Sequence, residues 1–247
     1  MVRDEEKARL EIANFEKFLD LGKTHFDRYE AQKPPEPDII AWKAENAFGI
    51  EVTNFYRQIE KQKESEEDRT LERALMLYRL HKGPNIYLSI MWAPHFTMRE
   101  RDREEIAAKI AALALAHAPA SNRWLTLDWH QFDRDLITAV DHISLYGLPE
   151  DSRTDGNAGR GRFVPEWTVS EMQMQLDRKK EKPARYRRQY VEIWLLLVSA
   201  FGAQSSWMEI NEKIRDACFT SPFDKIFVLS SFPHEVVLLK SSHVRTT

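Results

Sequence analysis

Two carboxylates lie near each other in the sequence, each on a segment that is typical of a β-strand. Asp38 follows the proline-rich residues 33–37 and opens the apolar run 39–42, and Glu51 lies in the middle of the segment 48–53. If these segments pair as a hairpin, the two carboxylates converge at one end of a sheet. Their mutual repulsion then requires a cation or a proton between them. Oxygen ligands of this kind suit Mg²⁺ or Mn²⁺.

Alternation along the second segment separates an apolar face from a polar face. The apolar face carries Phe48, Ile50 and Val52, and the polar face carries Gly49, Glu51 and Thr53. The backbone carbonyl of Val52 could add a further ligand beside Glu51. A metal held there could activate water and neutralise the charge that develops on a phosphodiester.

The motif Glu36-Pro-Asp38, followed by a hairpin and Gly49-Ile-Glu-Val-Thr53, resembles the active-site hairpin of the PD-(D/E)XK nuclease superfamily. Downstream, Lys179, Lys182 and Tyr186 followed by the apolar run 192–198 are similar to a helix–strand segment of uncharacterised members with the same Ile-Glu-Val-Thr variant. The resemblance covers residues 30–60 and 170–200. It implies a restriction-endonuclease-like α/β core, in which a helix, three strands, a helix and a further strand build a mixed sheet flanked by helices, with extra C-terminal elements here.

The resemblance also implies an activity, namely metal-dependent hydrolysis of phosphodiester bonds in DNA. The metal ligands would be Asp38, Glu51 and Val52, and the metal Mg²⁺ or Mn²⁺. Where the superfamily has a lysine, two residues after Glu51, this chain has Thr53. Either a lysine from elsewhere in the chain serves the attacking water, or the site is inactive and the chain acts as a binding or assembly module. An unrelated α/β protein with a chance match is the third interpretation.

The candidates for the displaced lysine are Lys179 and Lys180. They flank the inward stripe of a predicted helix on opposite sides, so spacing alone does not choose between them, and the resemblance favours Lys179. Superfamily members often add a carboxylate from the first helix, and here Glu16 is expected, with Glu11 as the second choice. The expected catalytic set is therefore Asp38, Glu51, Lys179, Thr53 and Glu16.

A basic run from Arg178 to Arg188 contains seven Lys and Arg residues and one acid. Basic clusters neutralise the phosphates of nucleic acids. The residues expected to contact DNA are Lys180, Lys182, Arg185, Arg187 and Arg188, together with Arg160 and Arg162 of a glycine-rich loop at 151–164.

Hydrophobic periodicity predicts the elements that position these groups. Helices are predicted over 5–21, 64–80, 99–117, 169–182 and 206–218, and strands over 38–42, 48–53, 86–92, 136–146, 192–199, 225–230 and 235–239. Because strands alternate with helices, we expect one α/β domain over 1–247, with insertions, around a mixed sheet. The length also allows two small domains as the alternative.

Composition excludes several classes of protein. The chain has 247 residues, 43% of them hydrophobic, and a formal net charge of −3. Cys218 is the only cysteine, which excludes an intrachain disulfide and a thiolate metal cluster. The longest apolar run, 193–203, is shorter than the ~20 residues that span a bilayer. We therefore expect a cytoplasmic protein without a membrane partner. The resemblance to nucleases adds the expectation of a homodimer if both DNA strands are cut, because many nucleases that do so are dimers.

Overall fold

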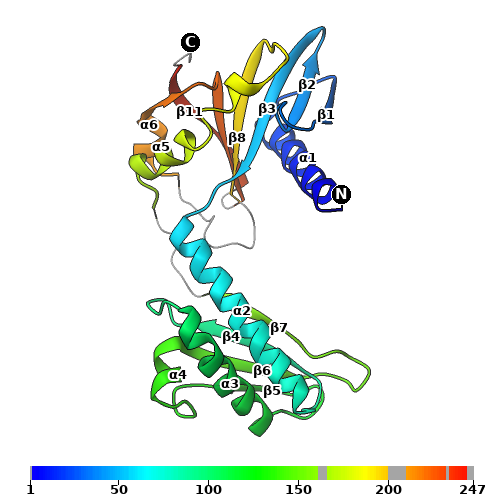
Figure 1. The fold of residues 1–247 in the computed structure, drawn as a ribbon, viewed down its shortest axis with the longest axis vertical. Helices are drawn as coiled ribbons and strands as arrows, with labels where there is room; N and C mark the ends of the chain where they lie inside the picture. The colour runs from blue at the N-terminus through cyan, green and yellow to red at the C-terminus, as the bar shows by residue number, and fades with distance from the viewer. Residues whose placement is uncertain (1, 161–165, 200–209, 232–233, 244–247) are drawn as a thin grey trace. The chain divides into compact units, whose positions relative to one another are not determined.

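The computed structural model describes residues 2–160, 166–199, 210–231 and 234–243 (Figure 1). The chain divides into two compact units, residues 1–57 with 164–247, and residues 58–163. In sequence, the second unit is an insertion into the first. None of the described helices has the length and apolarity that crossing a membrane requires. The fold is of the α/β class, with mixed sheets flanked by helices.

The first unit is built on a sheet that has seven strands in the described ranges, in the order β1-β2-β3-β8-β10-β11-β9. β1, β2 and β3 pair antiparallel, whereas β8 pairs parallel with both β3 and β10, so the sheet is mixed. The strand bounds are β1 Arg28–Ala31, β2 Ile39–Lys43, β3 Asn46–Asn54, β8 Glu192–Val198, β9 Cys218–Ser221, β10 Lys225–Ser231 and β11 His234–His243.

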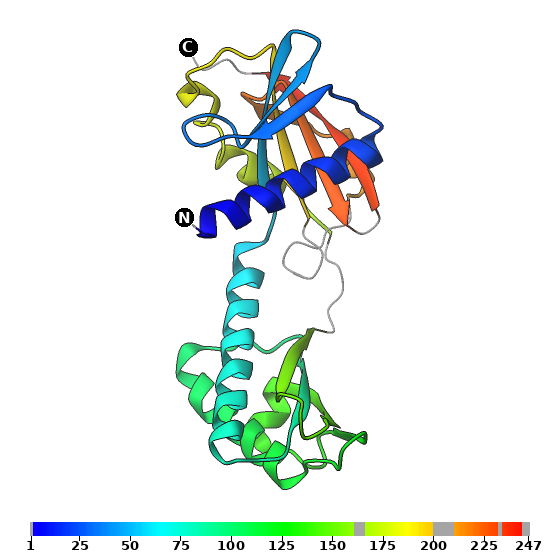
Figure 2. The ribbon, with the colours of Figure 1, turned by 90° about the vertical axis from the view of Figure 1, so that its right-hand side faces the viewer.

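Helices cover both faces of this sheet. α1 (Val2–Gly22) lies across one face, and α5 (Val169–Asp177) and α6 (Glu212–Asp216) lie on the other (Figures 1 and 2). Side chains of β8 alternate between the two cores: Trp194 and Leu196 pack with the α1 residues Phe15 and Phe18, and Leu195 packs with α5 and α6. A strand buried on both faces reads as a continuous apolar run, so the prediction for this segment is confirmed.

The predicted hairpin of β2 and β3 is confirmed. Lys43 pairs with Asn46, so Ala44 and Glu45 form the turn. Ala44 adopts a φ of 53°, in the left-handed region that residues with a Cβ rarely occupy. Its N–H donates to Asp27 Oδ2 at 2.6 Å, which helps to hold that conformation.

The predicted alternation along β3 is also confirmed. Ile50 and Val52 are buried in the core that α1 covers, with Phe48 packed against it. Glu51 therefore points to the opposite face of the sheet, the face of α5.

The second unit has a sheet of four strands within the described residues, in the order β5-β6-β4-β7. One face packs on helices, because Ile86, Leu88, Ile90 and Trp92 of β4 share a core with α2 and α3. The bounds are α2 Gln58–Leu80, β4 Ile86–Trp92, α3 Glu100–Ala116, β5 Trp124–Leu127, α4 Arg134–Ala139, β6 Val140–Gly147 and β7 Asp155–Arg160.

The base of the insertion is fastened within the first unit. Arg57, the last residue before the second unit, donates from Nη2 to the carbonyl oxygen of Glu166 at 2.5 Å. Its Nε lies 3.2 Å from Glu171 Oε1. The guanidinium also lies over the ring of Trp167, 4.8 Å from its centroid.

The structure corrects the expectation of one sheet. The strand predicted over 86–92 is β4, which belongs to the second sheet, and the third strand beside the hairpin is β1. β1 has no apolar alternation, since Arg28, Glu30 and Ala31 are exposed. Two further short strands, β5 and β9, were not predicted either.

Other elements differ in extent. The strand predicted over 136–146 begins as helix α4, which Asp133 caps by accepting from the N–H groups of Asp135 and Leu136. Of the helix predicted over 206–218, Glu212–Asp216 form α6, Cys218 begins β9, and residues 206–209 lie outside the described ranges. The loop predicted over 151–164 contains β7, whose backbone packs closely on β4 because Gly156 lacks a Cβ.

We predict that Gly156→Ala loosens β7. A Cβ there would lie 2.4 Å from the backbone oxygen of Leu88, so the strand would have to move away from β4. Gly159→Ala is the matched control on the same strand, because its nearest neighbour, at 3.0 Å, is the flexible end of Met91. Amide hydrogen exchange over 155–160 should accelerate clearly in Gly156→Ala and less in Gly159→Ala. Equal protection in the two variants would contradict the packing argument.

Candidate active site

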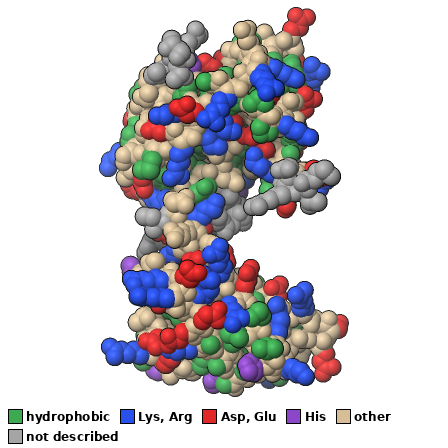
Figure 3. Space-filling model, viewed as in Figure 1, with side chains coloured by type: hydrophobic (Ala, Val, Ile, Leu, Met, Phe, Trp, Pro, Cys, Tyr) green, Lys and Arg blue, Asp and Glu red, His purple; other side chains and the backbone are tan. Residues whose placement is uncertain are grey.

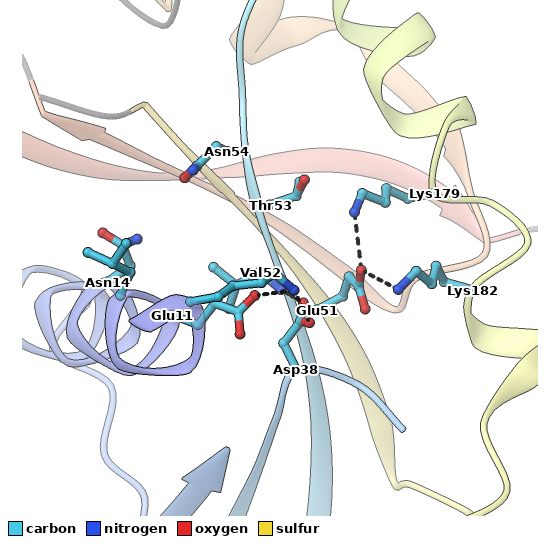
Figure 4. A pocket seen from close by; sticks show the side chains of 11 residues that line it. Glu11, Asn14, Asp38, Glu51, Val52, Thr53, Asn54, Lys179 and Lys182 are labelled. Carbon is cyan, nitrogen blue, oxygen red and sulfur yellow. Dashed lines mark hydrogen bonds and ion pairs between the residues drawn. The ribbon is translucent and has the colours of Figure 1, made fainter. Parts of the chain in front are cut away.

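A buried carboxylate lies at the centre of the candidate site. Only 1% of Glu51 is exposed. Its Oε1 lies 3.2 Å from Nζ of Lys179 and 3.2 Å from Nζ of Lys182 (Figure 4). Its Oε2 accepts a hydrogen bond from the Tyr186 hydroxyl at 3.0 Å. A buried charge persists only when it is paired and hydrogen-bonded, and here both oxygens of the carboxylate have partners.

The three donors to Glu51 come from one segment, which follows α5. α5 ends at Asp177, and the chain continues as turns in which Lys179 N–H donates to Leu176 O and Lys182 N–H donates to Lys179 O. The helix predicted as far as residue 182 is therefore too long. Lys179 and Lys182, three residues apart, both reach the same oxygen of Glu51, whereas Lys180 is exposed.

Asp38 lies next to this cluster, immediately before β2. Its Oδ2 accepts from the backbone N–H of Val52 at 2.9 Å, which fixes the carboxylate against β3. Burial and repulsion by Glu51 and Glu11 raise the pKa of Asp38 to about 6, although Lys7 and the Val52 N–H oppose the rise. Asp38 is therefore harder to ionise than a solvent-exposed aspartate.

Helix α1 contributes a further acid and base. Lys7 Nζ lies 2.9 Å from Glu11 Oε1 and 3.5 Å from Asp38 Oδ1. The hydrogen bond to Glu11 raises the pKa of Lys7, with a further contribution from Asp38. The expected Glu16 is outside the cluster: it is exposed and accepts from the Tyr29 hydroxyl at 2.8 Å. The second choice, Glu11, is the acid that the structure brings to the site.

These groups line one hollow of about 180 Å³. Three acids and three lysines are among its lining residues, which are Lys7, Leu10, Glu11, Asn14, Asp38, Glu51, Val52, Thr53, Asn54, Lys179 and Lys182. Figure 4 shows Glu11 and Asn14 on the α1 side and the two lysines on the opposite side of β3. The hollow thus brings together Asp38, Glu51, Val52, Thr53 and Lys179, as expected from the sequence.

Four of the other basic residues that were expected to contact DNA do not line this hollow. Lys180, Arg185, Arg187 and Arg188 are exposed and are not among the residues that line this hollow. Arg160 belongs to β7 of the second unit, and Arg162 lies outside the described residues. In the view of Figure 3, basic and acidic side chains are interspersed over the surface.

Sequence reasoning missed Lys7, Asn14 and the link from Tyr186 to Glu51. A signal for the first two existed, because Lys7, Glu11 and Asn14 recur at the i, i+4, i+7 spacing of one helix face. That polar stripe runs beside the apolar one that packs on the sheet. Tyr186 was named with Lys179 and Lys182 in the segment that carries the resemblance, but its contact with Glu51 depends on the path of the chain after α5.

The chemistry of the donors suits a hard divalent cation. Mg²⁺ is usually held by one or two carboxylates, with waters and substrate phosphate completing its shell, and Asp38 and Glu51 supply that number. No group of three or more His, Cys, Asp or Glu side chains arranged to hold a metal occurs in the described part of the chain. A metal here would therefore rely on few protein ligands.

We predict that Asp38→Asn stabilises the protein above pH 6. The folded state raises the pKa of Asp38 from 3.8 to about 6, so it binds the proton more tightly than the unfolded state. The contribution of Asp38 to the free energy of unfolding therefore falls as the pH rises from about 4 to about 6, by up to about 3 kcal/mol. Asparagine does not ionise, so the variant should have the higher melting temperature at pH 8, with the difference shrinking toward pH 4. A difference independent of pH would contradict this.

We predict that Tyr186→Phe destabilises the protein by about 1.5–3 kcal/mol, because it removes a hydrogen bond to a buried charge. Tyr190→Phe is the matched control. Its hydroxyl also donates to a carboxylate, Glu36 Oε2 at 2.6 Å, but Glu36 is only half-buried and can turn to water. Urea unfolding of both variants measures the difference. Equal losses of stability in the two variants would mean that burial of Glu51 does not strengthen its hydrogen bond with Tyr186.

Comparisons with known proteins identify no relative. No family model matches the chain, and neither a curated protein nor a solved structure matches it. The function must therefore be argued from the geometry of Asp38, Glu51 and their neighbours.

Proposed function

We propose that this chain is a metal-dependent nuclease of the PD-(D/E)XK type, which hydrolyses phosphodiester bonds in DNA with Mg²⁺ or Mn²⁺. The observation that carries the proposal is the meeting of Asp38 and Glu51 with Lys179, which lies far from both in sequence. Lys179 Nζ is 3.2 Å from Glu51 Oε1. An ammonium group thus reaches the acid pair although Thr53 stands where the superfamily has its lysine.

The topology of the first unit supports the same proposal. α1, β1, β2, β3, α5 and β8 follow one another as a helix, three strands, a helix and a strand, with the second unit inserted before α5. The four strands are neighbours in the order β1-β2-β3-β8, and the crossover from β3 to β8 is parallel. This is the element order that the resemblance implies.

Each residue has a role in this proposal. Asp38, Glu51 and the carbonyl of Val52 would hold the metal, and Glu11 would assist from α1. When bound, the metal would neutralise charge on the phosphodiester and make water a better nucleophile. Lys179 would orient the attacking water or a phosphate oxygen as a point charge. Lys182 and Tyr186 would keep the Glu51 carboxylate in place.

A second candidate is a binding or assembly module of the same fold without catalysis. Two observations favour it: Thr53 carries no charge, and both oxygens of Glu51 already have cationic or hydroxyl partners. Thermal unfolding in increasing Mn²⁺ discriminates the two candidates, since a ligand that binds only the folded state raises the melting temperature. The nuclease should show a rise that Asp38→Asn abolishes, and no rise up to millimolar Mn²⁺ would favour the module.

We predict that the wild-type protein cleaves DNA in the presence of Mg²⁺ and that Asp38→Ala and Glu51→Ala do not. Lys179→Met should lose about 10²–10³-fold in rate, the usual loss when one preorganised electrostatic group at the reacting centre is removed. Lys180→Met is the matched control, because this neighbouring lysine is exposed and lies outside the hollow. Cleavage that persists unchanged in both alanine variants would rule out the proposed site.

A further inference from the structure

A second hollow adjoins the one that holds the acid pair. It has a volume of about 140 Å³ and is lined by Thr53, Asn54, Phe55, Tyr56, Gln175, Arg178, Lys179 and Leu197. Thr53, Asn54 and Lys179 line both hollows, so they form the wall between them. Whatever occupies the second hollow lies directly beside the acid pair and its lysine.

The two hollows differ in charge. Three acids balance three lysines around the first, whereas the lining of the second contains Arg178 and Lys179 and no acid. Such a hollow attracts anions, and Arg is the side chain best suited to phosphate because its guanidinium donates several hydrogen bonds in a fixed plane.

The side-chain amide of Gln175 holds the guanidinium group of Arg178 in position. Arg178 Nη1 donates to Gln175 Oε1 at 3.1 Å, and Gln175 Nε2 donates to the backbone oxygen of Tyr56 at 3.3 Å. Gln175 therefore links Arg178 to the chain that leaves β3. Within the described residues, the remaining N–H groups of the guanidinium donate no hydrogen bond, and the side chain as a whole is exposed.

We propose that the second hollow binds the phosphate adjacent to the scissile one in a nucleic-acid chain, with Arg178 as its main ligand. Lys179, on the shared wall, lies between the two phosphates and contacts either. The inference rests on the proposed nuclease function and specifies its substrate: a polynucleotide with consecutive phosphates, in preference to an isolated phosphodiester.

The first arm of the test is cleavage of a DNA trinucleotide with Mg²⁺. One of its two linkages is replaced by a neutral methylphosphonate, at each position in turn. For the wild-type protein, one of the two replacements should slow cleavage of the remaining linkage by about tenfold or more, the loss expected for one charge-assisted hydrogen bond. Arg178→Ala should be slow on the unmodified trinucleotide and lose nothing further on that replacement. If the rate loss from Arg178→Ala and the rate loss from the methylphosphonate add together, the inference is overturned.

The second arm is metal-free binding of short single-stranded DNA in EDTA, which requires no cleavage. Arg178→Ala should weaken binding about tenfold and reduce the slope of log K against log salt by about 0.7. Arg9→Ala is the matched control, because Arg9 is an exposed arginine of α1 that lines neither hollow. If both variants weaken binding equally, the second hollow is not a phosphate site. If Arg178→Ala alone weakens binding but the wild-type protein cleaves nothing, the nuclease proposal fails and the phosphate site stands.

Discussion

Burial of one negative charge determines how the first unit is organised around its sheet. Glu51 lies in the middle of β3, where the alternation of side chains directs it away from the core that α1 covers. A carboxylate cannot remain there unless other groups replace its water. The segment after α5 supplies those groups, namely Lys179, Lys182 and Tyr186.

The same charge affects its surroundings. It contributes to the raised pKa of Asp38, and together with burial it raises the pKa of the Tyr186 hydroxyl, which keeps that hydroxyl protonated and donating. Lys7 approaches Asp38 from α1 on the other side of β3. Positive groups from two distant parts of the chain thus compensate an acid pair that neither strand could hold alone. Because the folded state raises the pKa of Asp38, ionisation of this carboxyl near neutral pH lowers the stability of the fold.

The sequence was informative where side-chain periodicity decides the structure. The alternation along β3 placed Ile50 and Glu51 on opposite faces, and the apolar run of β8 indicated a strand buried on both faces. It was less informative where structure depends on close backbone approach or on a helix end. β7 is a strand because Gly156 allows the backbone to pack on β4, and β1 carries mostly exposed polar residues with no periodic pattern.

The site was predictable to a similar degree. Asp38, Glu51 and Lys179 were expected together and lie together, because the hairpin motif fixes the acids and the resemblance indicated the lysine. The choice of Glu16 over Glu11 was wrong for the position of the acid, since a helix face cannot be assigned to a pocket before the helix is docked. The pairing of Lys182 with Glu51 was not predicted, because Lys182 was expected to contact DNA, although its spacing of three residues from Lys179 puts the two on one side of a helical turn.

Arg57 gives the insertion a particular meaning for the assembly of the site. By joining the chain that leaves β3 to the chain that returns at Glu166, it closes a long excursion with a few local contacts. The entropy lost on closing such a loop grows only with the logarithm of its length. The acid-bearing strand and the lysine-bearing turn would therefore meet at little extra cost whether the intervening residues were many or few. The first unit can accordingly tolerate insertions of very different length at this junction while the strand that carries Glu51 and the turn that carries Lys179 stay together.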